Sequence, residues 1–345
     1  MAGQVGAVDP GRVAHFRAPG WWRDGTILDD VDRAVARHPD RVAVVAHRAG
    51  RVEVLSYRHL DRLADRFAGA LLELGVRPGD PVSFQLPNWW EFVALFLGCA
   101  RIGAVTNAIV PILRRREVGF ILERVGSRVC IAPASFRGFD HAAMLAEIRE
   151  SCPTLEHVFV IGGEGPPGTR SFEEFFVDRR RESRALRAEL DALRPHGDAL
   201  AQIQFTSGTT GEPKGVLHSF NTLDVGVRAV GDPLGLTGDD VVLMFSPMGH
   251  QTGFLYGMCM PLRLGMKTVL QDVWDPQVML RLVEDEGVTW TMGSTTFVLD
   301  ACAAAADAHA DLSTLRFFTC GGAPIPPTAV TQARERLGVP LVAVW

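Results

Sequence analysis

Apolar residues recur along the chain in two patterns that alternate with each other. Over residues 60–74 they are spaced by three or four positions, which predicts the buried face of a helix. Over residues 82–86 they occupy every second position, which predicts a strand. Asn88 and Glu91 then have the spacing of a capping box, and they predict the start of the next helix.

The same alternation continues through the rest of the chain and predicts an α/β architecture. Strands separated by helices favour βα units in mixed, largely parallel sheets. Asp275 followed by Pro276 predicts the start of a helix that ends near Gly287. The other predicted helices span 26–37 and 114–124. Further strands are predicted at 42–46, 129–132, 157–161, 201–206, 241–245, 268–271, 288–292, 315–320 and 341–345.

Composition narrows the class of protein. With 345 residues, 47% of them hydrophobic and 22% charged, the chain is long and apolar enough for one large globular domain or two smaller ones. A net charge of -5 argues against a general nucleic-acid binder, because phosphate neutralisation requires a basic surface. Residues 92–105 are apolar but contain Arg101, so they predict a buried helix and no transmembrane segment.

Three further features concern location and surface. No basic segment followed by an apolar run opens the chain. The six cysteines contain no C-x-x-C pair, so we expect buried free thiols in a reducing compartment, the cytoplasm, and no metal site. Residues 171–193 are strongly charged and predict a solvated helix or surface connection.

One segment carries the chemistry: residues 204–216 read Gln-Phe-Thr-Ser-Gly-Thr-Thr-Gly-Glu-Pro-Lys-Gly-Val and follow a predicted strand. Gly208, Gly211 and Gly215 permit tight turns that point backbone N–H groups at an anion. Lys214 adds a positive charge and Pro213 stiffens the turn. The hydroxyl donors are Thr206, Ser207, Thr209 and Thr210. We therefore predict that this segment binds the polyphosphate of a nucleotide.

Glycine-rich segments of the chain also invite comparison with two other nucleotide-binding motifs. The P-loop pattern G-x-x-x-x-G-K-[ST] is not met, because Gly211 lies three positions before Lys214; a plain surface loop is the alternative. Residues 163–168 fit G-x-G-x-x-G, but Pro166 and Pro167 obstruct the turn into a helix that a dinucleotide site requires.

The string Thr-Ser-Gly-Thr-Thr-Gly-Glu-Pro-Lys-Gly at 206–215 resembles the phosphate-loop signature of the adenylate-forming (AMP-binding) superfamily. That superfamily includes acyl-CoA synthetases, the adenylation domains of peptide synthetases and beetle luciferases. Residues 246–253 resemble the family segment whose histidine, here His250, borders the carboxylate. Residues 319–324 resemble the glycine turn against which adenine packs.

The resemblance implies an acyl-CoA synthetase that uses ATP, Mg²⁺ and coenzyme A to activate a carboxylic acid. Lys214 would clamp the phosphates electrostatically and His250 would border the carboxylate. Adenine would lie against Gly321, Gly322 and Ala323. The β- and γ-phosphates would be held by Thr206, Ser207, Gly208, Thr209, Thr210, Gly211 and Lys214.

The resemblance covers nearly the whole chain and implies the large N-terminal domain, with approximate subdomains 26–195 and 196–345. Family members continue beyond a position like Trp345 into Gly-x-Thr-Glu, a ribose-binding aspartate and a C-terminal domain with a catalytic lysine. Because the chain ends inside a predicted strand, we expect a truncation that lacks this domain. We also expect the chain to be inactive by itself in acyl-adenylate formation.

Other segments of the sequence indicate the class of acid that the chain would activate. Residues 87–92 and 99–105 are similar to synthetases for medium-chain, alicyclic (cyclohexanecarboxylate-type) or aromatic acids. Phe254, Leu255 and Met258, close to His250, favour a hydrophobic acid from fatty acid metabolism. A non-catalytic nucleotide-binding remnant and an amino-acid adenylation domain stay open as alternatives, and the sequence predicts no oligomeric state.

Overall fold

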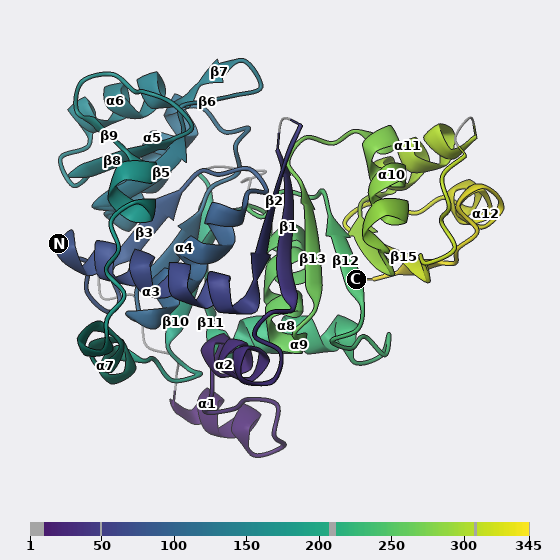
Figure 1. The fold of residues 1–345 in the computed structure, drawn as a ribbon, viewed down its shortest axis with the longest axis horizontal. Helices are drawn as coiled ribbons and strands as arrows, with labels where there is room; N and C mark the ends of the chain where they lie inside the picture. Colours follow the sequence, from purple (N-terminus) through teal and green to yellow (C-terminus); the bar gives the residue numbers. More distant parts are fainter. Residues whose placement is uncertain (1–9, 49, 207–211, 307–308, 345) are drawn as a thin grey trace. The chain divides into compact units, whose positions relative to one another are not determined.

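The computed structural model describes residues 10–48, 50–206, 212–306 and 309–344 (Figure 1). They form two compact units, each assembled from several segments of the chain. The first unit contains Met1–Asp29, His59–Leu86 and Glu91–Val225, and the second contains Asp30–Arg58, Pro87–Trp90 and Gly226–Trp345. The single boundary near residue 195 expected from the sequence stays a prediction.

The described part of the first unit contains a seven-stranded sheet of order β11-β10-β4-β3-β5-β8-β9. Neighbouring strands there are parallel except for the antiparallel pair β10 and β11. The strands are β3 (Pro81–Phe84), β4 (Val105–Ala108), β5 (Val129–Pro133), β8 (His157–Ile161), β9 (Thr169–Ser171), β10 (Leu200–Thr206) and β11 (Lys214–Ser219). A separate hairpin joins β6 (Ser135–Phe136) and β7 (Phe139–Asp140).

Central strands of this sheet are buried on both faces, as parallel strands covered by helices are. Aromatic rings fill part of the core of this unit: Phe67 packs edge to face on Phe172 and on Phe176, and the last two rings stack on each other. The helical elements are α1 (Pro10–Arg17), α3 (Tyr57–Glu73), α4 (Trp90–Arg101), α5 (Arg115–Val125), α6 (His141–Ser151), η1 (Glu173–Val177), α7 (Arg184–Leu193) and α8 (Phe220–Gly231). Of these, α3, α4 and α8 cross unit boundaries, as does α2 (Ile27–Arg37).

The second unit contains, within its described residues, another seven-stranded sheet of order β16-β15-β14-β12-β13-β1-β2. Only β1 and β2 pair in antiparallel fashion there. The strands are β1 (Val42–Arg48), β2 (Arg51–Ser56), β12 (Val241–Met244), β13 (Lys267–Gln271), β14 (Trp290–Gly293), β15 (Phe317–Cys320) and β16 (Leu341–Ala343). The helices are α2 (Ile27–Arg37), η2 (Gly253–Cys259), α9 (Met260–Leu264), α10 (Pro276–Glu286), α11 (Thr295–Ala305), α12 (Pro327–Gln332) and η3 (Ala333–Leu337).

The order of strands around β12 positions a candidate site. From β12 the chain passes to β13 on one side and then to β14 on the other. In open α/β sheets such a reversal opens a crevice at the carboxyl ends of the strands, where ligands bind. The segment after β12 contains His250, so the strand order places this residue at that edge.

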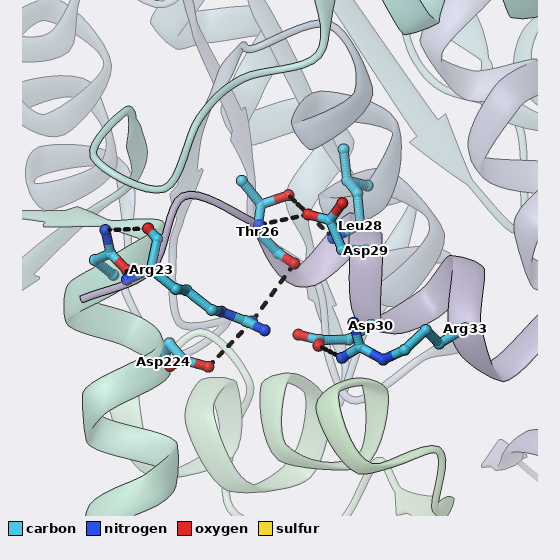
Figure 2. Close-up of polar contacts among 8 residues, drawn as sticks. Arg23, Thr26, Leu28, Asp29, Asp30, Arg33 and Asp224 are labelled. Atoms are coloured by element: carbon cyan, nitrogen blue, oxygen red, sulfur yellow. Dashed lines mark hydrogen bonds and ion pairs between the residues drawn. The ribbon is translucent and has the colours of Figure 1, made fainter. Parts of the chain in front are cut away.

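Local capping signals explain several helix starts. Asp275 accepts hydrogen bonds from the backbone N–H groups of Gln277 and Val278, and the left-handed Gly287 ends α10, as predicted. Thr26 caps α2: its hydroxyl accepts from Leu28 N, while Asp29 accepts from Thr26 N (Figure 2).

The residues before α2 are tied to α8 within the first unit. Arg23 donates to the Thr26 carbonyl and forms an ion pair of 3.1 Å with Asp224 (Figure 2). Its backbone N–H and carbonyl also exchange hydrogen bonds with the Asn221 amide. The N-terminal segment is thereby fixed to the helix that directly follows β11.

All the strands predicted from the sequence are present, within two residues at most boundaries. The capping box at Asn88 and Glu91 is wrong: α4 begins at Trp90, and Asn88 uses its amide on distant backbone groups. Gly215 lies in β11 opposite Phe205 and not in a turn, which corrects its assigned role. The strands β2, β4, β6, β7, β9 and β11 were not predicted.

Other predictions are confirmed. All six cysteines, which lie in the described chain, are buried free thiols, and burial raises the pKa of Cys99 and Cys130 to about 12. The charged segment 171–193 forms η1 and α7, and its Arg181 is paired with Glu73. Residues 163–168 lead into β9 and not into a helix. In the part of the chain that is described, no helix has the length and apolarity needed to cross a bilayer.

Candidate functional site

The β10/β11 hairpin presents the predicted phosphate-binding segment. Thr206, the last residue of β10, is the register partner of Lys214, the first residue of β11. The Thr206 hydroxyl lies 3.5 Å from the Lys214 carbonyl oxygen, and both side chains are exposed. The hairpin therefore brings together Thr206 and Lys214, the two residues that flank positions 207–213 in the sequence, and leaves both side chains exposed.

Five predicted site residues lie outside the described residues: Ser207, Gly208, Thr209, Thr210 and Gly211. Their roles stay predictions. Thr206 and Lys214 border them on either side, at the carboxyl edge of the first sheet, because β10 runs parallel to β4. This edge is where parallel α/β sheets bind ligands.

His250 stands at the start of a helix in the second unit. Its backbone N–H donates to Pro247 O (2.9 Å), and its carbonyl accepts from Phe254 N (2.9 Å), the first turn of the helical stretch 251–264. A π-helix, Gly253–Cys259, follows immediately, a form that recurs at functional sites.

The His250 ring has a defined tautomer. Its Nδ1 accepts a hydrogen bond from Thr252 N at 3.3 Å, so the neutral ring carries its proton on Nε2. Desolvation lowers the pKa of His250, which favours that neutral form at pH 7. The side chain is exposed, so Nε2–H is available to donate to a ligand such as a carboxylate.

The glycine turn after β15 shows why small residues are required there. A Cβ on Gly321 would lie 2.6 Å from Val344 O, and Gly322 has a φ of 79°, which favours glycine. Gly321 N donates to Gly293 O at 3.3 Å. The chain then continues through Ala323 to α12, the strand-to-helix turn that the sequence predicts.

His250 and the glycine turn share one edge of the second sheet. They follow the carboxyl ends of β12 and β15, which are separated by the single strand β14. Two strand spacings correspond to about 10 Å. A nucleotide-sized ligand lying across this edge would therefore reach from Gly321–Ala323 to the segment that contains His250.

A separate cavity of about 1000 Å³ lies at the opposite end of the β10/β11 hairpin. Phe16, Trp21 and Trp22 line it together with His196 and His218. Its strand residues are Leu200 in β10 and Leu217, His218 and Ser219 in β11, which lie three to six residues, or about 10–20 Å, along the strands from Thr206 and Lys214. This cavity is distinct from the predicted phosphate site.

Within the described residues, no group of three or more His, Cys, Asp or Glu side chains is arranged to hold a metal ion. The exposed hydroxyl and ammonium groups of Thr206 and Lys214 can both donate to phosphate oxygens.

Comparison with known proteins identifies the family. The family described as AMP-binding enzyme matches residues 31–345. The chain belongs to the AMP-binding enzyme family. The resemblance expected from residues 206–215 is therefore confirmed over most of the chain.

The relatives of this AMP-binding chain include several ligases. It is 33% identical over 335 residues to medium-chain fatty-acid–CoA ligase of Escherichia coli, covering 97% of this chain and 57% of that protein. It is 30% identical to 2-hydroxy-7-methoxy-5-methyl-1-naphthoate–CoA ligase of Streptomyces carzinostaticus, covering 96% of this chain and 60% of that protein. The AMP-binding chain thus spans less than two thirds of the length of these relatives.

Solved structures confirm the fold of the AMP-binding chain. The structure of MbtA from Mycobacterium smegmatis matches with a TM-score of 0.81 and 27% identity, covering 97% of this chain and 59% of that chain. The N-terminal domain of FACL13 from Mycobacterium tuberculosis matches with a TM-score of 0.76 and 23% identity, covering 93% of this chain and 75% of that chain. The predicted α/β class, with mixed and largely parallel sheets, is therefore correct.

Proposed function

We propose that the protein is an AMP-forming carboxylate–CoA ligase. The observation that carries the proposal is the β10/β11 hairpin, which sets the Thr206 hydroxyl and the Lys214 ammonium at the two ends of a glycine- and hydroxyl-rich connection. The family match over residues 31–345 and the CoA ligases among the relatives support it.

The reaction has two balanced steps. A carboxylate oxygen bonds to the α-phosphorus of ATP and pyrophosphate leaves, which yields acyl-AMP. The sulfur of CoA then bonds to the acyl carbon, AMP leaves, and the thiol proton is released to solvent. The first step brings two anions together, so positioning and charge neutralisation dominate its catalysis.

Each predicted residue has a role in these steps. Thr206 and Lys214, with the intervening hydroxyl and glycine residues, would bind the β- and γ-phosphates and stabilise the charge on departing pyrophosphate. The Nε2–H of His250 would donate to the carboxylate. Gly321, Gly322 and Ala323 would lie against adenine, and Mg²⁺ bound to the phosphates would supply further positive charge.

A hydrophobic acid is the proposed substrate class, in a cytoplasmic enzyme of fatty acid metabolism. Phe254, Leu255 and Met258 are buried in the helix that begins after His250, so the protein interior behind the proposed carboxylate position is apolar. Relatives whose names specify medium-chain fatty acids and a naphthoate support this choice. Six buried cysteines that form no disulfide support a reducing compartment.

A thioester-forming assay tests the proposal. The 345-residue chain and the full-length protein are incubated with ATP, Mg²⁺, CoA and a panel of acids, and pyrophosphate and acyl-CoA are measured. The panel contains acetate, octanoate, cyclohexanecarboxylate, benzoate and glycine. We expect acyl-CoA from the hydrophobic acids with the full-length protein and none from glycine.

Other outcomes are distinguishable in the same assay. Pyrophosphate release without acyl-CoA would favour an adenylation domain. A full-length protein that releases no pyrophosphate with any acid would contradict the ligase. ATP binding without any turnover would favour the non-catalytic remnant.

A further inference from the structure

Asn88 is a buried polar side chain at the edge of the second sheet. It belongs to the short segment Pro87–Trp90, which lies in the second unit although the residues before and after it belong to the first. Only 2% of Asn88 is exposed. A buried amide is costly unless its donors and acceptor find partners, so its contacts are informative.

The Asn88 amide joins two strand ends to the segment after β12. Its Nδ2 lies within donor distance of the carbonyl oxygens of Ser246 (3.0 Å), Met244 (3.3 Å) and Gln271 (3.3 Å). Its Oδ1 accepts from the backbone N–H of Met248 at 2.8 Å. Met244 ends β12 and Gln271 ends β13, so one side chain links both strands to residues 246–248.

The same segment leads directly to His250. Asn88 holds the residues on both sides of Pro247, whose carbonyl oxygen accepts the His250 N–H at 2.9 Å. Gly253 packs closely on this backbone, because a Cβ there would lie 2.4 Å from Pro247 O. The position of the imidazole thus depends on a backbone turn that Asn88 holds in place.

A neighbouring residue anchors Asn88 itself. The Trp89 indole N–H donates to Asp272 at 3.2 Å, and the Arg48 guanidinium carbon lies 3.4 Å from the centroid of the Trp89 ring. Asp272 directly follows Gln271, whose carbonyl Asn88 contacts. The Pro87–Trp90 segment is therefore attached at two adjacent points to the carboxyl end of β13, which limits the freedom of the Asn88 side chain.

We propose that Asn88 is a positioning residue for His250, acting through the 246–248 turn between the carboxyl ends of β12 and β13. Asn88 contacts the turn and not the reacting atoms. Its loss leaves buried carbonyl oxygens and the Met248 N–H without their partner, so the turn loosens and His250 is displaced. The part of the inference that concerns the carboxylate rests on the proposed function; the part that concerns the turn does not.

The kinetic consequence is selective. Phosphate binding is proposed for the β10/β11 hairpin, which belongs to the first unit, whereas Asn88 and the 246–248 turn belong to the second. We therefore expect Asn88→Ala to raise the KM for the carboxylic acid at least 10-fold, while the KM for ATP changes less than 3-fold. Asn88→Asp keeps the acceptor for Met248 N–H, but it replaces the Nδ2 donor with an oxygen that faces carbonyl oxygens and repels them. The KM for the acid should therefore rise at least as much as in Asn88→Ala.

A readout that does not need activity accompanies the kinetics. Amide hydrogen exchange at Met248 and His250, followed by mass spectrometry or NMR, should accelerate at least 10-fold in Asn88→Ala. Asn107→Ala is the matched control, because Asn107 is a buried asparagine of the first sheet that donates to Ser83 (2.6 Å). It removes a buried amide of the same size but should leave exchange at Met248 and the acid KM unchanged.

Hydrogen exchange and kinetics each test whether Asn88 positions His250. Unchanged exchange at Met248 in Asn88→Ala overturns it, as do equal increases in the KM for acid and for ATP. Asn88→Ser replaces the alanine variant if that does not fold, since its hydroxyl is too short to join β13 and the turn together. If the wild-type protein forms no thioester, the proposed function fails, and exchange at Met248 and His250 still decides the role of Asn88.

Discussion

Thr206 and Lys214 face each other as register partners where the β10/β11 hairpin opens. The Thr206 hydroxyl lies 3.5 Å from the Lys214 carbonyl oxygen, while β10 is itself paired to β4 inside the sheet. The exposed Lys214 ammonium is therefore tethered by a strand edge and not by a free loop. A tethered charge loses less entropy on binding phosphate than one on a flexible loop.

Replacing Lys214 by alanine should weaken ATP binding by about 10- to 100-fold, the value of one charge-assisted contact to phosphate. Isothermal titration with ATP and Mg²⁺ measures the change. Lys267→Ala is the matched control, because the sequence contains only these two lysines. Lys267 donates to the Glu286 carbonyl at 2.7 Å, so its loss should affect stability and leave ATP affinity intact. Equal affinities for wild type and Lys214→Ala would exclude the phosphate role.

Gly253→Ala should disturb the turn that precedes His250. The added Cβ would lie 2.4 Å from Pro247 O and 2.5 Å from Ser246 O, which are backbone atoms and cannot rotate away. We expect a loss of about 1–3 kcal/mol in the free energy of unfolding, measured by urea denaturation. A rise in the KM for the acid should accompany it.

Gly119→Ala provides the control for this substitution. Gly119 lies in α5, has no unfavourable φ, and a Cβ there would meet Ile148 at an ordinary 3.9 Å. Alanine should stabilise this helix by about 0.5–1 kcal/mol. If the free energy of unfolding of Gly253→Ala were as high as that of Gly119→Ala, Gly253 would not be closely packed against the backbone of Pro247.

Asp275→Ala should remove the cap of α10. The Asp275 carboxylate accepts from Gln277 N at 2.8 Å and Val278 N at 3.1 Å, so two N–H groups of the first turn lose their acceptor. A destabilisation of about 1 kcal/mol is expected from denaturation curves. Asp275→Asn keeps an acceptor oxygen and should cost much less; similar losses for both variants would point to charge and not to capping.

The buried ring of His141 should make stability depend on pH. Its Nδ1 lies 3.2 Å from Gln85 Oε1, and its Nε2 has no hydrogen-bond partner among the described residues. Burial, assisted by the charge of Arg114, lowers the pKa of His141 to about 4. Protonating the folded protein is therefore unfavourable, since it would place an unpaired charge in the interior.

The direction of this pH dependence follows from proton uptake by the unfolded chain. Between about pH 6.5, the ordinary histidine pKa, and pH 4 the unfolded chain binds a proton at His141 that the folded chain does not. The stabilisation is present above pH 6.5 and is lost as the pH falls, by on the order of 3 kcal/mol at pH 4 and below. Urea denaturation at several pH values measures the slope.

His141→Gln isolates this contribution. Burial also lowers the pKa of His59, His157, His218 and His250, but these residues titrate in both proteins. The free energy of unfolding of the wild type, relative to that of the variant, should therefore fall as the pH falls from 6.5 to 4. The slope of this fall should correspond to the uptake of up to one proton. Parallel stability curves for the two proteins over that range would contradict the assignment to His141.

Local signals in the sequence predicted the elements well. The Asp275-Pro276 pair and Gly287 set the two ends of α10, because capping and left-handed termination depend only on neighbouring residues. The phosphate-loop string likewise needs no tertiary information, since its residue types and spacing are contiguous. β6, β7 and β9 escaped prediction because they have only two or three residues, β2 and β11 because they are largely exposed, and β4 because Thr106 and Asn107 interrupt its apolar pattern.

Gly215 shows where residue type alone misleads. Glycine is common in turns, which favoured a turn at 215, but the residue pairs with Phe205 inside the hairpin. A Cβ there would approach the Phe205 ring to 3.3 Å, so the packing of that ring and not a backbone bend accounts for the small side chain.

By itself the sequence determined the α/β class, most strands, the ends of α10 and the membership of the AMP-binding family. Periodicity, capping and the contiguous motif at 206–215 are short-range properties, so they can be read without the fold. Only the tertiary structure decided what Asn88 does. Its spacing to Glu91 satisfied a local capping pattern, yet Met248, its hydrogen-bond partner, lies 160 positions away. A buried amide binds whatever donors and acceptors folding brings within 3 Å, and which strand ends meet there is set by sheet order and not by neighbouring residues.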